Sequence, residues 1–208
     1  LGNLGNAYAS LGQVEKALEY YQQGLVISKE IGHRWGEGNQ LGNLGNAYAS
    51  LGQVEKALEY YQQALAIHKE IGNRQGEGNQ LGNLGSAYAS LGQVEKALEY
   101  YQQALAIHKE IGNRRGEGNQ LGNLGLAYAN LGQVEKAYKL FQDALAICRD
   151  IGYLKGEAEQ LRNIGLVYQE KNQPETALGY LKEALEIFTE IGIKPEADKV
   201  NKIIKTIS

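Results

Sequence analysis

Residues 41–80 read LGNLGNAYASLGQVEKALEYYQQALAIHKEIGNRQGEGNQ, and nearly the same letters stand on both sides of them. Residues 81–120 differ from this stretch at two positions, Asn46/Ser86 and Gln75/Arg115. Residues 1–40 differ from it at five, which are Gly24/Ala64, Val26/Ala66, Ser28/His68, His33/Asn73 and Trp35/Gln75. Weaker copies begin at Leu121 and Leu161. A period of this length is typical of solenoids, in which each unit packs against its neighbours.

Each unit predicts two helices. Apolar residues recur at the three- and four-residue steps of one helical face within residues 76–90, and again within residues 93–111. Gly92 and Gly112 follow these segments and suit the left-handed conformation that commonly ends a helix. The apolar positions are Leu81, Leu84, Ala87 and Tyr88 in the first segment and Val94, Ala97, Leu98, Tyr101, Ala104, Leu105, Ile107 and Ile111 in the second.

The first of these two helices is weak by itself. Gly76, Gly78, Gly82 and Gly85 lie at its start or inside it, and each interior glycine costs about 0.5–1 kcal/mol relative to alanine. Stacking against neighbouring units must therefore hold this helix in place. We expect an isolated 40-residue unit to be unfolded.

Charge and cysteine content limit the classes of partner. The chain has 21 Lys and Arg against 24 Asp and Glu, so it lacks the basic surplus of a nucleic-acid or anionic-membrane binder. Its single cysteine cannot form an internal disulfide, which favours a cytoplasmic location. We expect no membrane-spanning helix, because no run of 18 apolar residues occurs. The start in mid-pattern at Leu1 and the lack of methionine predict a piece of a longer protein.

The spacing of several residues carries a family resemblance. Leu41-x-x-Leu44-Gly45-x-x-Tyr48, followed by Ala57, Tyr61 and Ala64, resembles the tetratricopeptide repeat signature. Leu41 stands where that family often has Trp and Lys69 where it often has Pro, and the period is 40 rather than 34. The chain is similar to the Leu-Gly-Asn repeats of Pins-type polarity scaffolds and to arrays in cyanobacterial multidomain proteins. The resemblance extends to about Ile193.

The pattern and the resemblance together predict an all-α, right-handed superhelical solenoid of antiparallel helix pairs with a C-terminal capping helix. We expect five repeats at residues 1–40, 41–80, 81–120, 121–160 and 161–193, and the cap at residues 194–208. The cap has one apolar face, made by Ala197, Val200, Ile203, Ile204 and Ile207. No such cap precedes Leu1, so we expect that two copies can stack end to end there and form a homo-oligomer.

The resemblance implies that the first helices line a concave groove for a protein or peptide partner. Asparagine offers both donors and acceptors to an extended backbone. Glycines such as Gly42 leave room for close approach, but they replace the Lys that clamps a carboxylate in chaperone-binding relatives. A second interpretation is structural, with Asn79 and Asn83 bonded to each other or across repeats. The predicted groove residues are Asn39, Asn43, Asn46, Asn79, Asn83, Ser86, Asn119, Asn123 and Asn163.

Three other patterns carry no predicted chemistry. Residues 76–82 are glycine-rich but do not form G-x-G-x-x-G. Arg34, Arg74 and Arg114 each precede a Glu by three residues, which predicts local pairing. A third pattern is the column Ser28, His68, His108, Cys148 and Phe188, which invites a zinc site. Helices of adjacent repeats lie about 8–10 Å apart, too far for ligands about 2.0–2.3 Å from one ion. We expect this column on the outer or inter-repeat surface.

Three functions therefore compete. The leading hypothesis is a protein-interaction scaffold that binds an extended peptide in the groove. The alternatives are a regulatory segment of a larger signalling protein and a self-assembling repeat array. We expect no enzymatic activity, no cofactor and no metal, because no set of base, nucleophile or metal ligands stands out from the repeat. The uniform repeats also fit an idealised design, although the irregular fifth unit favours a natural origin.

Overall fold

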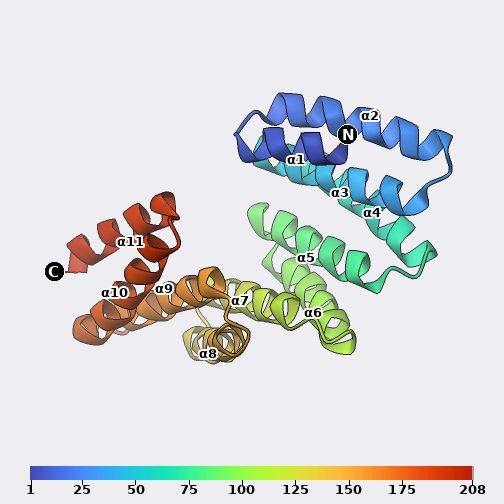
Figure 1. The fold of residues 1–208 in the computed structure, drawn as a ribbon. Coiled ribbons are helices and arrows are strands. Elements are labelled where there is room, and N and C mark those ends of the chain that lie inside the picture. Colours follow the sequence, from blue (N-terminus) through green and yellow to red (C-terminus); the bar gives the residue numbers. More distant parts are fainter. Residues whose placement is uncertain (208) are drawn as a thin grey trace. The chain divides into compact units, whose positions relative to one another are not determined.

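The structure is a computed structural model that describes residues 1–207, and within that range it consists of helices and the short turns that join them (Figure 1). The last residue of the predicted cap, at position 208, lies outside the described residues. The helices are α1 (Gly2–Ser10), α2 (Val14–Glu30), α3 (Arg34–Ser50), α4 (Val54–Glu70), α5 (Arg74–Ser90), α6 (Val94–Glu110), α7 (Arg114–Asn130), α8 (Val134–Asp150), α9 (Leu154–Glu170), α10 (Pro174–Glu190) and α11 (Lys194–Ile207).

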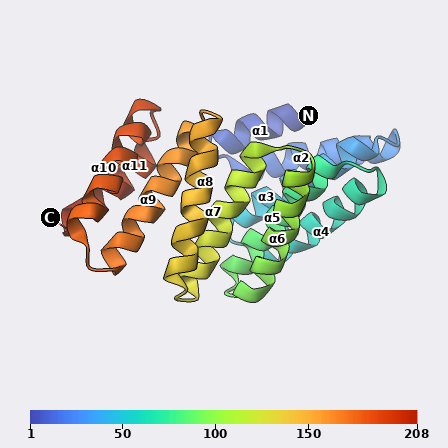
Figure 2. The same ribbon diagram turned by 90° about the horizontal axis from the view of Figure 1, so that it is seen from below.

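The chain divides into two compact units, residues 1–111 and residues 112 onward. Unit 1 contains the pairs α1/α2, α3/α4 and α5/α6, and each pair packs against the next. Unit 2 contains α7/α8 and α9/α10, followed by α11, and Figure 2 shows these helices running side by side. The predicted fold class is confirmed: antiparallel helix pairs follow one another in tandem.

Glycines end the helices as the sequence predicts. Gly92, between α5 and α6, has a φ of 72°, and Gly52, at the same place one repeat earlier, has a φ of 73°. Residues other than glycine rarely adopt this left-handed conformation. In the fifth repeat Asn172 takes the place with a φ of 55°, which suits asparagine better than most residues.

Within unit 1 the core runs from one pair into the next. Ala57 and Tyr61 of α4 form one buried cluster with Leu84 and Ala87 of α5. The second helix of a pair therefore supports the glycine-rich first helix of the following pair. This contact supplies the stacking that the weak first helix requires.

Close packing within a pair depends on a glycine. A Cβ built on Gly45 would lie 2.5 Å from the ring carbon Cδ1 of Tyr61, far inside van der Waals contact. The same arrangement joins Gly85 to Tyr101. This glycine column therefore lets the helices of a pair approach closely.

The His and Cys column is buried between helices. Position 68 holds a histidine that is almost fully covered, and its ring lies between Gly38 of α3 and Gly76 of α5. Its equivalents His108 and Cys148 are equally buried. The column therefore lies on the inter-repeat surface, and the outer-surface alternative is wrong.

Helix α11, the predicted cap, is built like a further first helix. Helix α11 begins at Lys194, forty residues after α9 begins at Leu154, and it packs against α10. Ala197 and Val200 are its buried residues. No helix within residues 1–207 combines the length and the apolar character that crossing a membrane requires.

Candidate ligand-binding face

In unit 1 one side of the first helices remains exposed. On α3 this side begins at Trp35 and continues through Asn39 to Asn46. Steps of four and eleven residues return to nearly the same direction on a helix, so these side chains form one stripe. Neighbouring helices repeat the stripe, since α3 packs against α5 and Gly2 of α1 contacts α3. We call these residues the asparagine face of unit 1: Asn6, Trp35, Asn39, Asn46, Gln75, Asn79 and Ser86.

One column of this face is bonded to the second helix. The Tyr61 hydroxyl donates to Asn46 Oδ1 at 2.9 Å, and the Tyr21 hydroxyl donates to Asn6 Oδ1 at 2.8 Å. In the next pair the Tyr101 hydroxyl donates to Ser86 Oγ at 3.2 Å. Asn46 and Ser86 therefore have a structural role in addition to any role toward a ligand.

The two other asparagine columns differ in exposure. Asn79 is exposed and its Oδ1 accepts a hydrogen bond from Gln75 Nε2 at 3.1 Å. Asn83 is half-buried and its Nδ2 donates to Gln80 Oε1 at 3.3 Å. Of the structural alternatives, the bond between Asn79 and Asn83 does not form, because each bonds to a glutamine of its own helix. Asn39 and Asn43, their equivalents in α3, are both half-exposed.

Glycines in these helices serve helix packing. Gly42 is buried, and a Cβ built on it would lie 2.8 Å from Nε2 of Gln80 on the neighbouring helix. The expectation that Gly42 leaves room for a ligand is wrong, since the Gln80 side chain fills that room. Gln40 lies against Gly2 in the same way, and its Oε1 is buried without a hydrogen-bond partner in the described residues.

Unit 2 presents a different surface on its first helices. Asn119 is exposed and Asn123 is half-exposed on α7. Leu126 and Leu166, at the place of Asn46, are 43% and 38% exposed. Asn163 is only 4% exposed and accepts a hydrogen bond from Arg162 Nη2 at 3.3 Å, so this predicted groove residue does not reach the surface.

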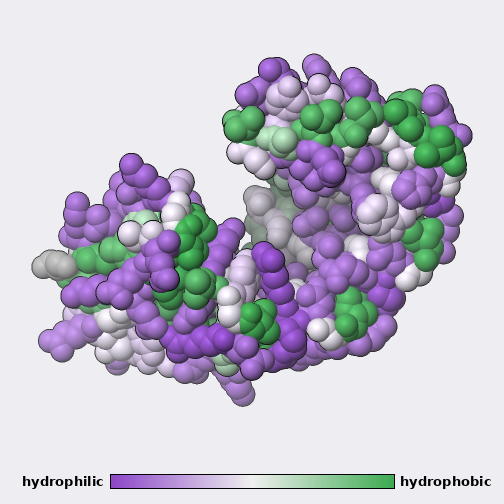
Figure 3. Space-filling view, viewed as in Figure 1, coloured by the Kyte–Doolittle hydropathy of each residue, from purple (hydrophilic) through white to green (hydrophobic). Residues whose placement is uncertain are grey.

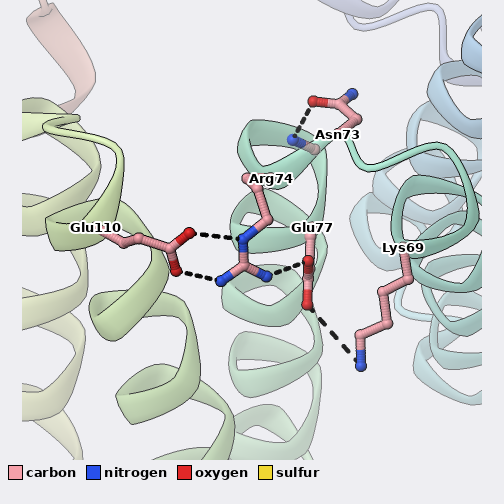
Figure 4. A network of polar contacts seen from close by, with 6 residues as sticks. Lys69, Asn73, Arg74, Glu77 and Glu110 are labelled. Atoms are coloured by element: carbon pink, nitrogen blue, oxygen red, sulfur yellow. Dashed lines mark hydrogen bonds and ion pairs between the residues drawn. The ribbon is translucent and has the colours of Figure 1, made fainter.

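An ion-pair network fixes the start of α5, the first helix of the third pair in unit 1. Arg74 Nη1 lies 2.5 Å from Glu77 Oε2, and Arg74 Nε donates to Glu110 Oε1 at 3.1 Å (Figure 4). Lys69 Nζ reaches the other oxygen of Glu77 at 4.0 Å. The predicted pairing within three residues is confirmed. The bond from Arg74 to Glu110 on α6 is not evident from the sequence, because it joins residues 36 apart.

The pKa shifts of Glu110 and Cys148 do not indicate a catalytic or metal-binding role. The bond to Arg74 lowers the pKa of Glu110. Burial, with help from Glu159 and Glu157, raises the pKa of the Cys148 thiol to about 11, which disfavours the reactive thiolate. Within residues 1–207 no group of three or more His, Cys, Asp or Glu side chains is placed to hold a metal ion.

Comparison with known families accounts for the tandem helix pairs. The model of the tetratricopeptide repeat matches residues 1–70, 38–110 and 118–190. The chain belongs to the tetratricopeptide repeat family. The resemblance of Leu44, Gly45 and Tyr48 to that family is thereby confirmed at the level of the family. No match was found among curated protein sequences.

Solved structures share the tetratricopeptide repeat fold. RapI in its apo form aligns with 96% of this chain and 73% of its own, at a TM-score of 0.82 and 18% identity. The STAND protein with a tetratricopeptide repeat sensor from Pyrococcus horikoshii has a TM-score of 0.81 and 21% identity over 96% of this chain and 30% of its own. The putative kinesin light chain repeats of Podosopora anserina have a TM-score of 0.70 and 24% identity over 92% of this chain and 94% of their own.

Sequence reasoning missed two residues of the exposed face. Trp35 and Gln75 lie four residues before Asn39 and Asn79, and this spacing could have placed them on the same stripe. They were overlooked because the segment from Arg34 to Gly38 contains two glycines and a charged pair, which look like a turn. In the structure this segment is the first turn of α3.

Proposed function

We propose that the chain is a non-enzymatic, cytoplasmic interaction module that binds an extended peptide segment of a partner on its first-helix faces. The observation that carries the proposal is the repeated exposure of amide side chains at Asn39, Asn46 and Asn79 on neighbouring helices. The likeness to Pins-type Leu-Gly-Asn repeats supports this proposal. Tetratricopeptide repeat proteins in general bind other proteins.

The amide ladder suits a peptide backbone. Backbone N–H and C=O groups need hydrogen-bond partners wherever a ligand buries them. Charged side chains contribute little to the unit 1 face, because those of α3 and α5 are paired as Arg34 with Glu37 and Arg74 with Glu77. Recognition of a backbone by neutral amides therefore fits this face better than a carboxylate clamp.

The test compares two pairs of asparagines. The variant N39A/N79A removes two amides of the face, one half-exposed and one exposed. In a pull-down from the source cell it should no longer capture the partner, while its melting temperature stays within about 2 °C of the wild-type value. The control N43A/N83A changes the half-buried column and should lower the melting temperature, since Asn83 bonds to Gln80. Unchanged capture by N39A/N79A would refute the proposal.

A second candidate function is self-association at the N-terminal end. Figure 3 shows a band of hydrophobic side chains over α1 and α2. On these two helices Leu4 is 49% exposed and Ile27 is 45% exposed. We propose that two copies meet through this face, burying Leu4 and Ile31.

Sedimentation over a concentration series tests the dimer. The wild-type chain should shift from monomer to dimer as its concentration rises. Ile31→Lys places a charge in the band and should keep the chain monomeric. Ile71→Lys, which changes the equivalent and less exposed residue of the next repeat, is the control and should still dimerise. A wild-type monomer at every concentration argues against this candidate.

A further inference from the structure

We propose that the asparagine face of unit 1 selects an extended, uncharged segment containing proline, with Trp35 as the side chain that the proline rings cover. This inference rests on the proposed peptide-binding function and names the chemistry of the ligand. Three independent observations support it: where the repeats differ, which hydrogen-bonding groups the face leaves open, and how Trp35 lies.

The two complete pairs of unit 1 differ at only two places. Residues 34–70 and 74–110 are identical except at Trp35/Gln75 and Asn46/Ser86. All four of these residues are exposed on the asparagine face. Packing and the ion-pair network are thus the same in both pairs, and the differences gather where a ligand would lie.

One of the two differences has a structural explanation. Asn46 and Ser86 each accept a hydrogen bond from a tyrosine hydroxyl of the second helix, so either residue satisfies the same donor. In unit 2 Leu126 stands at this place, and Phe141, which has no hydroxyl group, stands at the place of the tyrosine. Trp35 is not explained in this way, since its packing partner among aromatic rings is His33, 6.0 Å away at 37°.

The hydrogen-bonding capacity of the face is biased toward donors. The Oδ1 atoms of Asn6, Asn46 and Asn79 already accept hydrogen bonds from Tyr21, Tyr61 and Gln75. An asparagine amide carries two N–H donors and one oxygen with two lone pairs. Because one lone pair of each oxygen is already used, these three residues offer a ligand more N–H donors than acceptor sites, and a ligand rich in acceptors matches them best.

Proline segments have this complementary character. Each proline contributes a carbonyl acceptor but no backbone N–H, and a polyproline II helix leaves its carbonyl groups without internal partners. Such segments bind at exposed aromatic side chains, whose ring faces pack against the pyrrolidine rings. Trp35 is 56% exposed and lies one helical turn before Asn39, so aromatic surface and donors stand side by side.

The charged residues of α3 are paired with each other or with Glu70, so the face does not favour a strongly charged ligand. Helix α3 contains only two charged residues, Arg34 and Glu37, and they lie 2.6 Å apart in an ion pair. Glu70 completes the pairing of Arg34 through a bond to Nε at 3.1 Å. An acidic segment would find no unpaired cation on this helix, and a basic segment no unpaired carboxylate.

The single tryptophan makes a direct assay available. Trp35 is the only tryptophan of the chain, so its emission reports on this face alone. The probes are a ten-residue peptide rich in proline and a matched peptide with serine at the proline positions. We expect the proline peptide to shift Trp35 emission to shorter wavelength and to bind at least about tenfold more tightly, which corresponds to about 1.4 kcal/mol.

A variant drawn from the chain itself provides the control. Trp35→Gln copies Gln75, which stands at the same place in the next pair, so the fold tolerates it. With labelled peptides read by fluorescence anisotropy, W35Q should bind the proline peptide about tenfold more weakly and the serine peptide unchanged. Its melting temperature should equal that of the wild-type chain.

The outcomes separate this inference from the function on which it rests. Equal affinity for the two peptides, binding of neither, or an unaffected W35Q overturns the proline inference. The peptide-binding function then stands or falls separately, on whether N39A/N79A loses its partner. If W35Q binds the proline peptide weakly and N39A/N79A loses the partner, both are supported.

Discussion

Glycine residues in these helices have opposite effects at different positions. Gly45 accommodates the Tyr61 ring, and a Cβ there would lie 2.5 Å from that ring. We predict that Gly45→Ala destabilises the chain by about 1–2 kcal/mol, because overpacking costs about 1–3 kcal/mol and the better helix propensity of alanine returns up to about 1. The measurement is the midpoint of urea unfolding followed by circular dichroism.

Gly179 provides the matched control for that prediction. It also lies inside a helix, α10, but a Cβ built there meets nothing within 4 Å. Gly179→Ala should therefore raise stability by about 0.5–1 kcal/mol. If both substitutions shift the midpoint in the same direction, the contact between Gly45 and Tyr61 does not explain the glycine column.

At the scale of the element, the first turn of α5 is anchored by Arg74. Glu77 is almost buried and depends on Arg74 at 2.5 Å, whereas the side chain of Lys69 is 4.0 Å away. We predict that Arg74→Leu, which copies Leu154 at the same place in α9, costs about 1–3 kcal/mol, because it leaves a buried carboxylate poorly paired. Adding Glu77→Gln should restore part of the loss, as measured by a double-mutant cycle.

The bond from Arg74 to Glu110 should matter less than the bond to Glu77. Glu110 is more than half exposed, and exposed ion pairs contribute about 0–1 kcal/mol. Glu110→Gln is therefore the control, with an expected loss below about 1 kcal/mol. A larger loss for E110Q than for R74L would contradict this ranking.

A single helix pair should not fold in isolation. The buried partners of Leu84 and Ala87 in α5 include Ala57 and Tyr61 of the preceding pair, and α5 contains four glycines that weaken it. We predict that a peptide of residues 74–110 shows less than about a third of the helical circular dichroism per residue of the whole chain. A strongly helical peptide would show that stacking is not required.

Most of the fold could be predicted from the sequence because the repeat displays each signal several times. The helices and the turn at Gly92 follow from local pattern, and so does helix α11, whose apolar residues Ala197 and Val200 keep helical spacing. The candidate site was less predictable. Asn43 and Asn46 look alike in sequence, but their hydrogen-bond partners, such as Gln80 for Asn83 and Tyr61 for Asn46, come from other helices.

At the scale of the whole molecule, the two units carry different chemistry on the same framework. Unit 1 joins tyrosine hydroxyls to polar residues, as in Tyr61 and Asn46, whereas unit 2 has Phe141 and Leu126 at these two places. Unit 1 also contains all three histidines of the chain. Two of them, His68 and His108, are almost fully buried, whereas His33 is exposed.

The buried histidines should make unit 1 the acid-sensitive half of the chain. Burial lowers the pKa of His68 and His108 from the ordinary value of 6.5. The folded chain then binds fewer protons than the unfolded chain, so stability is complete above pH 6.5 and decreases as the pH falls below it, until the folded-state pKa is reached. Carboxylates such as Glu110 and Glu196 also have lowered pKa values, but their contribution to stability is lost only below about pH 4.5.

We predict that the urea midpoint reported by Trp35 fluorescence is lower at pH 5 than at pH 7. The variant H68C/H108C, which copies Cys148, should remove most of this decrease. Since Trp35 lies in unit 1, an unchanged midpoint at pH 5 would show that the two histidines gain protons equally well in the folded and the unfolded chain, which contradicts the prediction.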